Sequence, residues 1–351
     1  MKRKITTLFV IAAASACLVA QKPFVAGEIQ SKTEVKFGKF EMRMYASDVS
    51  GTTSTFYMWK NGGETSGSRW NEIDIETFGK NPTLWQSNPI WEYNDNDQNI
   101  KRWEGYHGGL QISKTWVTFG MEWTPNYIAW FNNGVEVRRI IKGQNAPSGT
   151  DPVGNITDPM KMCFNHWSAF SVEWLGPFNT ADLPSYQFVD WLTYRPWNGN
   201  GFDGVSIRHD FNNINEVTNS FNISTHTFGD NRCDFTTKSV GVVNGYLWLG
   251  IFPAGQEKPP VAPITTGIEE LESNEVVSIS PQPFSTSSTI QLKTGSLIES
   301  IGVYNSEGKM MNLLKGNNSD RMTFGNELKT GLYYIQINSS NGAYTTKIVK
   351  Q

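Results

Sequence analysis

The segment from Trp70 to Glu76, WNEIDIE, constrains the fold of this chain more than any other. Acidic and apolar residues alternate through it, and a period of two is that of a β-strand, whose successive side chains point to opposite faces. Glu72, Asp74 and Glu76 therefore share one face of the predicted strand. A plain solvent-facing strand over an apolar core explains the alternation. It does not explain three neighbouring acids, because like charges side by side are destabilising.

The region from residue 30 to 253 continues in short strands separated by turn residues, and no stretch keeps helical periodicity for three turns. Two of the predicted hairpins turn at Asn133-Gly134 and Asn244-Gly245. Asn-Gly favours the positive φ angles that a two-residue hairpin turn needs. We therefore predict an all-β fold with two large antiparallel sheets packed face to face.

Composition argues against several other classes of protein. The chain has 30 Lys plus Arg against 33 Asp plus Glu, which argues against nucleic acid as a partner. Beyond the N-terminus no stretch offers about 20 uninterrupted apolar residues, so no transmembrane span is predicted in the mature form. The histidines and cysteines lack zinc-binding spacing, and no glycine motif for nucleotides is present. A Ser-His-Asp triad stays open, because its members can lie far apart in a sequence.

The N-terminus has the layout of a secretory signal peptide over residues 1–20, because basic residues precede an apolar run that ends before Gln21. An uncleaved anchor and a lipoprotein site at Cys17 are the alternatives. Cleavage before Gln21 leaves Cys163 and Cys233. An exported protein can join these two in one disulfide or keep them as separate core thiols.

Composition changes after residue 253. Residues 254–271 begin with a proline-rich stretch that is predicted to be a linker. In residues 272–351 short β-rich runs recur between turn residues, which predicts a small antiparallel β domain. The predicted strands are Val276–Ile279, Thr289–Leu292, Ile298–Tyr304, Gly331–Ile337 and Ala343–Val349.

Glycoside hydrolysis is a reaction that uses neighbouring acids. A retaining enzyme needs two carboxyl groups about 5–5.5 Å apart, one as nucleophile and one as proton donor. At ~3.3 Å per residue the Cα atoms of Glu72 and Glu76 lie about 13 Å apart, a gap that two side chains leaning inward can close. Asp74 between them would keep one neighbour protonated through the repulsion of like charges.

The same strand resembles the catalytic strand of glycoside hydrolase family 16, because Glu72 to Glu76 is followed by Phe78-Gly79-Lys80. The likeness is to the bacterial lichenases, which cut mixed-linkage β-1,3-1,4-glucan. It implies a jelly-roll (concanavalin-like) β-sandwich in which Glu72 is the nucleophile, Asp74 assists and Glu76 is the acid/base. The laminarinase branch usually has one more residue between the Asp and the second Glu. Its absence here favours lichenase or xyloglucan-active relatives.

The order of the segments resembles that of a circularly permuted lichenase. Residues 210–212, 228–232 and 245–249 resemble strands that normally come first in a lichenase, and here they come last. The implied join lies in Trp197–Gly204. Permutation is tolerated where the original termini lie close together on the surface.

The resemblance also implies a set of glucan-binding residues. Aromatic faces suit sugar C–H groups and amides bond hydroxyls, although core packing is the alternative for each aromatic residue alone. His226 and Cys163 depart from the pattern, because they stand where the permuted relatives carry a Trp and an Arg. The matching positions are Tyr57, Trp59, Asn61, Glu64, Trp70, Gln86, Asn88, Asn165, Trp167 and Asn231.

Family members often hold one structural calcium, and the matching positions here are Asp190, Asp210 and the carbonyl of Gly245. Hard oxygen ligands fit this ion, with water completing the shell, and ordinary surface aspartates are the alternative. No cofactor is predicted for catalysis.

The tail resembles the C-terminal sorting domain of type IX secretion cargo. The matching pieces are Ser280–Pro283, Val303–Gly308, Leu328–Tyr334 and Lys347–Lys350. The resemblance implies the secretion machinery as a partner and a secreted or cell-surface location. An immunoglobulin-like accessory module that binds sugar is the alternative.

Together these observations predict a secreted, monomeric, retaining endo-β-1,3-1,4-glucanase with a polysaccharide substrate. Two rivals stay open. One is a related family 16 hydrolase that acts on xyloglucan or β-1,3-glucan, and the other is a non-catalytic carbohydrate-binding sandwich.

Overall fold

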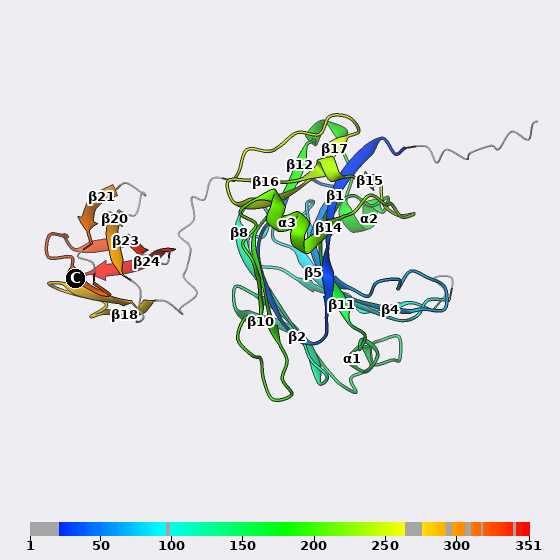
Figure 1. Cartoon of the computed structure of the whole chain (residues 1–351), viewed down its shortest axis with the longest axis horizontal. Helices are drawn as coiled ribbons and strands as arrows, with labels where there is room; N and C mark the ends of the chain where they lie inside the picture. The colour runs from blue at the N-terminus through cyan, green and yellow to red at the C-terminus, as the bar shows by residue number, and fades with distance from the viewer. Residues whose placement is uncertain are drawn as a thin grey trace, which may run out of the picture. The chain divides into compact units, whose positions relative to one another are not determined.

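The computed structural model describes residues 21–95, 99–263, 276–292, 297–305, 310–316, 319–339 and 342–351. The predicted signal peptide, Cys17 and residues 264–271 of the predicted linker lie outside this part of the chain. The chain divides into two compact units between Ala262 and Pro263, and each is described by itself (Figure 1). Within the described ranges, no helix has both the length and the apolar character needed to cross a membrane.

The first unit contains two antiparallel layers, one of which we call the front sheet. Its strands lie in the order β14, β1, β11, β3, β4 and β5, with β6 and β7 both paired to β5. The bounds are β14 (Phe221–Ile223), β1 (Phe24–Val35), β11 (Met160–Trp167), β3 (Thr53–Trp59), β4 (Arg69–Phe78), β5 (Trp85–Tyr93), β6 (Lys101–Arg102) and β7 (Gly105–His107).

The second layer, the back sheet, has the order β10, β9, β8, β2 and β12. One half of β12 then pairs with β17 and the other half with β13, and β16 lies beyond β17. The bounds are β10 (Val135–Ile141), β9 (Tyr127–Asn132), β8 (Trp116–Trp123), β2 (Gly38–Tyr45), β12 (Ser185–Pro196), β17 (Tyr246–Pro253), β13 (Ile207–His209) and β16 (Val240–Val243).

The first residues of β1 connect the two sheets at one end, because they pair with the end of β17 and, in parallel, with β15 (Cys233–Phe235). The helices are short. They are α1 (Pro152–Asn155), α2 (Val172–Leu175) and α3 (Ile214–Ser220), with 3₁₀ turns at Thr180–Asp182 and Thr237–Ser239.

The core lies between the sheets and follows the alternation of the sequence. Ile73 and Ile75 of β4 are fully buried against the back sheet residues, which include Met42 of β2 and Phe119 of β8. Trp130 of β9 also donates its indole N–H to the backbone carbonyl of Asp74 at 3.0 Å. The back sheet therefore fixes the backbone of β4 at its central acid, and the predicted all-β sandwich of jelly-roll type is confirmed.

Both predicted hairpins are confirmed. Asn133 and Gly134 have φ of 47° and 76° between β9 and β10, and Asn244 and Gly245 have φ of 50° and 81° between β16 and β17. Positive φ at both central positions is the requirement that Asn-Gly meets.

The segment of the predicted permutation join, Trp197–Gly204, connects β12 to β13 at the surface. The permutation itself stays a prediction. Residues just past 253 lie on the first unit, because Ala254 packs beside Phe252 and the hydroxyl of Tyr186 donates to the carbonyl of Lys258 at 3.1 Å.

The second unit has two small sheets, in the orders β18-β19-β22 and β21-β20-β23-β24. All five predicted strands are present, whereas β21 and β22, which carry a weaker β-rich pattern, were not predicted. Its core includes Ile290, Ile301, Ile335 and Ile348. The bounds are β18 (Val276–Ser280), β19 (Ser288–Leu292), β20 (Ile298–Tyr304), β21 (Met310–Lys315), β22 (Arg321–Phe324), β23 (Gly331–Ser339) and β24 (Gly342–Lys350).

Candidate active site

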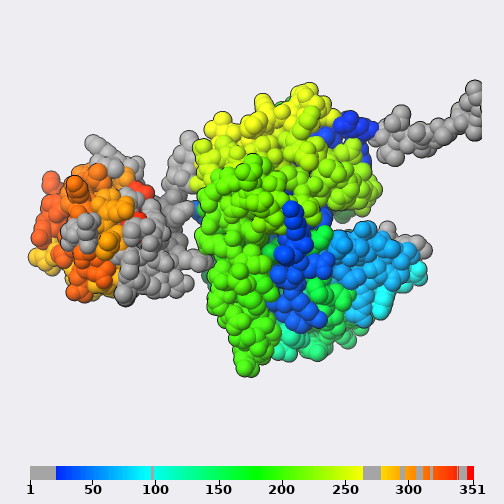
Figure 2. Space-filling view, viewed as in Figure 1, coloured from blue at the N-terminus to red at the C-terminus, as the bar shows by residue number. Residues whose placement is uncertain are grey.

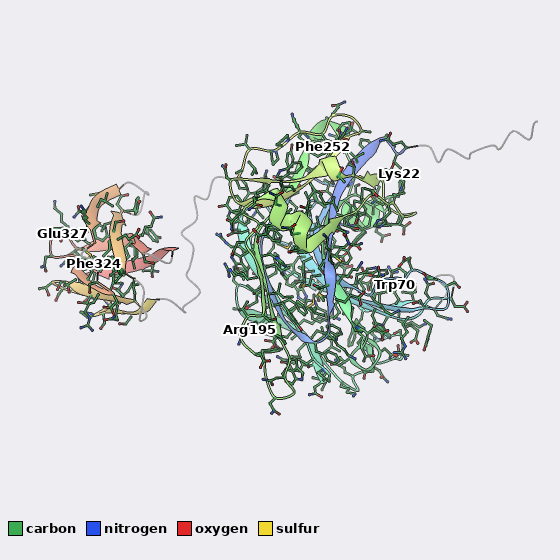
Figure 3. The ribbon with its side chains drawn as sticks, viewed as in Figure 1. Lys22, Trp70, Arg195, Phe252, Phe324 and Glu327 are labelled. Atoms are coloured by element: carbon green, nitrogen blue, oxygen red, sulfur yellow. The ribbon has the colours of Figure 1, made fainter. Side chains whose placement is uncertain are left out.

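Strand β4 places Glu72, Asp74 and Glu76 on the face of the front sheet opposite the core. It pairs with β3 and β5 over its length with no shift of register, so no bulge interrupts the three acids. A hollow opens in the first unit between the yellow-green segments that include β15 and the light-blue segments that include β4 (Figure 2). Trp70 of β4, labelled in Figure 3, lies on the light-blue side of it.

Residues directly opposite one another on neighbouring strands form rows across this face, because paired residues point to the same side. The Glu72 row contains Trp59, Glu72, Ile90 and Arg102. The Asp74 row contains Gln30, Cys163, Tyr57, Asp74 and Asn88. The Glu76 row contains Glu28, Asn165, Thr55, Glu76, Gln86 and Tyr106.

The two outer acids have different hydrogen-bond partners. Trp70 donates its indole N–H to Glu72 Oε2 at 2.6 Å, and Glu72 also bonds to the carboxyl group of Asp74. Gln86 donates its amide N–H to Glu76 Oε2. Asp74 is 3% exposed, and its Oδ1 has no partner within the described structure.

Burial raises the pKa of all three carboxyl groups. It raises the pKa of Glu72 to about 7, against the opposing effect of its bonds from Trp70 and Asp74. It raises the pKa of Glu76 to about 8, against the opposing effect of the bond from Gln86. The pKa of Asp74 is raised well above its usual range by burial first and then by the negative charges of Glu72 and Glu76. Near neutral pH the site therefore holds one more readily ionised carboxyl and two that keep their protons.

Sequence comparison places this site in a known family. The model of glycosyl hydrolases family 16 matches residues 6–184. A beta-glucanase of Fibrobacter succinogenes is 35% identical over 264 residues, which cover 73% of this chain and 72% of that protein. The chain belongs to glycoside hydrolase family 16.

Other members match less of the chain. A beta-glucanase of Brevibacillus brevis is 30% identical over 174 residues, which cover 49% of this chain and 61% of that protein. Among solved structures, the Bacillus licheniformis beta-glucanase has a TM-score of 0.40 and 24% identity, and the match covers 49% of this chain and 77% of that one.

The second unit matches the model of a secretion system C-terminal sorting domain over residues 278–351. The prediction of type IX secretion to the cell surface or the extracellular space is thereby confirmed. The chain therefore contains a family 16 domain followed by a secretion sorting domain.

Seven of the predicted glucan-binding residues lie on the carboxylate face of the family 16 domain. Trp59 and Trp70 contact each other edge to face at a ring separation of 5.0 Å, beside Glu72. Asn88 is buried opposite Asp74, and its Oδ1 has no described partner. Trp167, which shares a row with Phe78 on the carboxylate face, packs against Trp174 and Phe228. The seven are Tyr57, Trp59, Trp70, Gln86, Asn88, Asn165 and Trp167.

The other three predicted binding residues lie outside the strands of this face. Asn61 and Glu64 are exposed in the β3–β4 connection, where Lys161 donates to Asn61 at 3.1 Å. Asn231 is fully buried, and its Oδ1 accepts the backbone N–H of Cys233 at 2.8 Å.

Glu28 of β1 is a fourth acid on this face that the sequence did not predict. It is 1% exposed and accepts four hydrogen bonds. The donors are Tyr57 Oη at 2.8 Å, Asn165 Nδ2 at 3.1 Å, Gln30 Nε2 at 3.0 Å and Ser224 Oγ at 2.6 Å. Four donors and no acceptor fit an ionised carboxylate, which only accepts. A buried, fully bonded group of this kind orders the floor of the site.

The two departures from the family pattern lie around Glu28. Cys163 is fully buried, and burial raises the pKa of its thiol well above the usual range. His226 Nε2 lies 3.8 Å from Glu28 Oε1 and its ring contacts Phe235 edge to face. Cys163 and Cys233 are both free thiols, so the alternative of two separate core cysteines is the one that the structure contains.

Arg102 of β6 brings a positive charge to the site, and the sequence did not single it out. It lies two strands from Glu72 in the same row, and its positive charge lowers the pKa of all three acids of β4. A two-residue strand leaves too short a pattern to predict its register.

Both aspartates of the predicted calcium site form ion pairs. Arg43 lies 2.7 Å from Asp190, and Arg208 lies 2.7 Å from Asp210. Over the described residues no group of three His, Cys, Asp or Glu side chains could hold a metal ion. The side chains present therefore do not fit a calcium ion well, because an arginine already pairs with each carboxylate. The site stays a prediction, and a thermal midpoint unchanged by EGTA would argue against it.

Proposed function

We propose that this family 16 protein is a secreted retaining endo-glucanase that hydrolyses β-1,4 bonds in mixed-linkage β-1,3-1,4-glucan. The observation that carries the proposal is the unbulged strand β4, which presents two glutamates of different pKa on either side of a protonated aspartate. The name of the Fibrobacter relative, a beta-glucanase, supports the substrate class.

In the first chemical step one outer glutamate acts as the nucleophile and the other as the proton donor. Glu72, the acid with the lower pKa, attacks the anomeric carbon as a carboxylate and forms a glycosyl ester. The C–O bond to the leaving sugar breaks, and its electron pair goes to the glycosidic oxygen. Glu76, the acid with the higher pKa, gives that oxygen its proton.

The second step reverses the roles of proton donor and acceptor. Glu76, now ionised, takes a proton from water as the water oxygen attacks the anomeric carbon. The ester bond to Glu72 breaks, and the product keeps the original β configuration. Protonated Asp74 donates to Glu72 and holds the nucleophile in place.

The aromatic pair Trp59 and Trp70 offers apolar ring surface beside Glu72, and the polar side chains of Asn88 and Asp74 lie on the same face of the front sheet. Such a combination of ring faces and a few polar groups is typical of sugar sites.

The test is the release of reducing sugar by the mature chain from barley β-glucan, laminarin, xyloglucan and carboxymethylcellulose. Release from barley glucan alone, lost in Glu72→Gln and in Glu76→Gln, is the expected result, and NMR should show the β anomer as the first product. Activity on another polymer would keep the mechanism and change the substrate. Binding without release in the wild-type chain would favour the non-catalytic sandwich.

A further inference from the structure

Two hydrogen bonds in series connect Glu76 to a helix that the sequence analysis did not single out. Trp174 of α2 donates its indole N–H to Gln86 Oε1 at 3.3 Å, and Gln86 donates its amide N–H to Glu76 Oε2. Gln86 is 3% exposed, so water does not compete freely for its amide. The indole of Trp174 is therefore connected to Glu76 of β4 through one residue of β5, Gln86.

The chemistry of these groups sets the direction of both bonds. An indole N–H can only donate, so the amide oxygen of Gln86 must face Trp174. The NH₂ group of the same amide must then face Glu76, where it can only donate. Glu76 Oε2 is thereby kept as an acceptor. When Glu76 carries a proton, that proton lies on Oε1.

Several contacts hold the indole in place. The ring of Trp174 contacts two other aromatic rings. Its centroid lies 6.4 Å from that of Phe78 and 5.7 Å from that of Trp167. Ser171 caps α2 by accepting the backbone N–H of Trp174 at 3.2 Å. Leu175 is fully buried, and its carbonyl accepts the backbone N–H of Gly51 at 2.9 Å. A donor fixed in this way imposes its own orientation on the amide it meets.

We propose that Trp174 is a positioning residue that, through the amide of Gln86, determines which oxygen of Glu76 carries the catalytic proton. This inference rests on the proposed function, because it assigns the proton that Glu76 gives to the glycosidic oxygen. Reserving Oε2 for Gln86 leaves the Oε1–H bond as the one that breaks.

Loss of the indole N–H has a predictable effect on Glu76. The freed amide can turn and present its oxygen, which favours the protonated carboxyl and raises its pKa. The charged and titratable groups that face Glu76 stay in place, so a change in the alkaline limb of the activity profile reports the amide. These groups are Glu72, Asp74, Arg102, Glu104 and Tyr106.

The experiment compares two substrates of the full mature chain and its Trp174→Phe variant, which keeps an aromatic ring. Barley β-glucan needs a proton on its leaving oxygen, whereas a 2,4-dinitrophenyl β-glycoside of a gluco-oligosaccharide does not. We expect kcat on barley glucan to fall about tenfold with KM within about twofold, a small part of what general acid catalysis contributes. On the dinitrophenyl glycoside kcat should fall less than about twofold, and on barley glucan the alkaline limb should move up by about half a pH unit.

Trp167→Phe is the matched control, because it makes the same change in the neighbouring ring, which has no described bond to Gln86. It should alter KM, with equal effects on kcat for both substrates. Gln86→Met should reproduce the substrate dependence of Trp174→Phe by itself, which tests the proposal even if Trp174→Phe folds poorly. In the Gln86→Met background, Trp174→Phe should have no further effect.

An equal fall in kcat on both substrates in Trp174→Phe would overturn the inference while leaving the proposed function intact. So would an additive effect of Trp174→Phe on kcat in the Gln86→Met background. A failure of the proposed function looks different. In that case the wild-type chain releases no sugar from any glucan, or Glu76→Gln keeps full activity on barley glucan.

Discussion

The hydrogen bond between Tyr57 and Glu28 predicts a measurable loss of stability in Tyr57→Phe. The hydroxyl donates to Glu28 Oε2 at 2.8 Å, and both side chains are buried, at 9% and 1% exposure. A hydrogen bond to a charged group contributes about 1.5–3 kcal/mol, and here water cannot easily replace the lost donor. For a unit of this size each kcal/mol shifts the thermal midpoint by about 2–4 °C, so Tyr57→Phe should lower it by roughly 3–12 °C.

Tyr127→Phe is the matched control for this measurement. Its hydroxyl donates to Glu122 Oε2 at the same 2.8 Å, but Tyr127 is partly exposed and the guanidinium of Arg139 lies 3.9 Å from the same oxygen. Water and Arg139 should therefore keep Glu122 partnered, and the free energy of unfolding should fall by less than about 1 kcal/mol.

Urea and thermal unfolding of both variants at pH 7, followed by tryptophan fluorescence, give the two free-energy changes. The prediction requires Tyr57→Phe to lower the free energy of unfolding clearly more than Tyr127→Phe does. Equal costs, or a Tyr57→Phe change within about 0.5 kcal/mol of wild type, would refute the reasoning that Glu28 depends on buried donors.

Four further results are expected. Arg102→Met removes the charge that lowers the pKa of Glu72 and Glu76, the two proposed catalytic glutamates, so both limbs of the pH–activity profile should move to higher pH, as measured on barley glucan. The raised pKa of Glu76 means that the folded state loses stability as the pH rises from its unfolded pKa through about 8, so the thermal midpoint should fall more between pH 5 and pH 8 in wild type than in Glu76→Gln. A chain that ends at Pro253 should melt below one that ends at Ala262, because Ala254 and the carbonyl of Lys258 cover the aromatic cluster around Phe252 and Tyr186; equal midpoints would contradict this. Deletion of residues 272–351 should trap the protein in the periplasm, as cell fractionation would show, whereas unchanged secretion would contradict the role of the tail.

Local patterns in the sequence were sufficient for the parts of the fold that depend on neighbouring residues. The alternation around Asp74 determines which side chains of β4 share a face, because the strand period acts over two residues. Asn-Gly determines both hairpin turns, because the required φ angles belong to those two residues. Five strands of the sorting domain followed from the same kind of local signal.

Contacts between distant strands could not be predicted in this way. Glu28, Arg102 and Trp174 join the site from β1, β6 and α2, and none of them has a distinctive local pattern. The positions of Glu28 and Arg102 depend on the register of strands that are far apart in the chain. A shift of one residue in the strand pairings would turn Glu28 and Arg102 to the other face, whereas Trp174 is placed by the packing of α2 against Phe78 and Trp167.

The sequence by itself therefore determined the three acids, their common face and the class of fold. Only the tertiary structure decided which groups surround them: the four donors on Glu28, the charge of Arg102 and the oriented amide of Gln86. The physical reason is that side-chain direction within a strand is set by the backbone of adjacent residues, whereas the electrostatics of a buried carboxyl is set by every group that packing brings within a few ångströms.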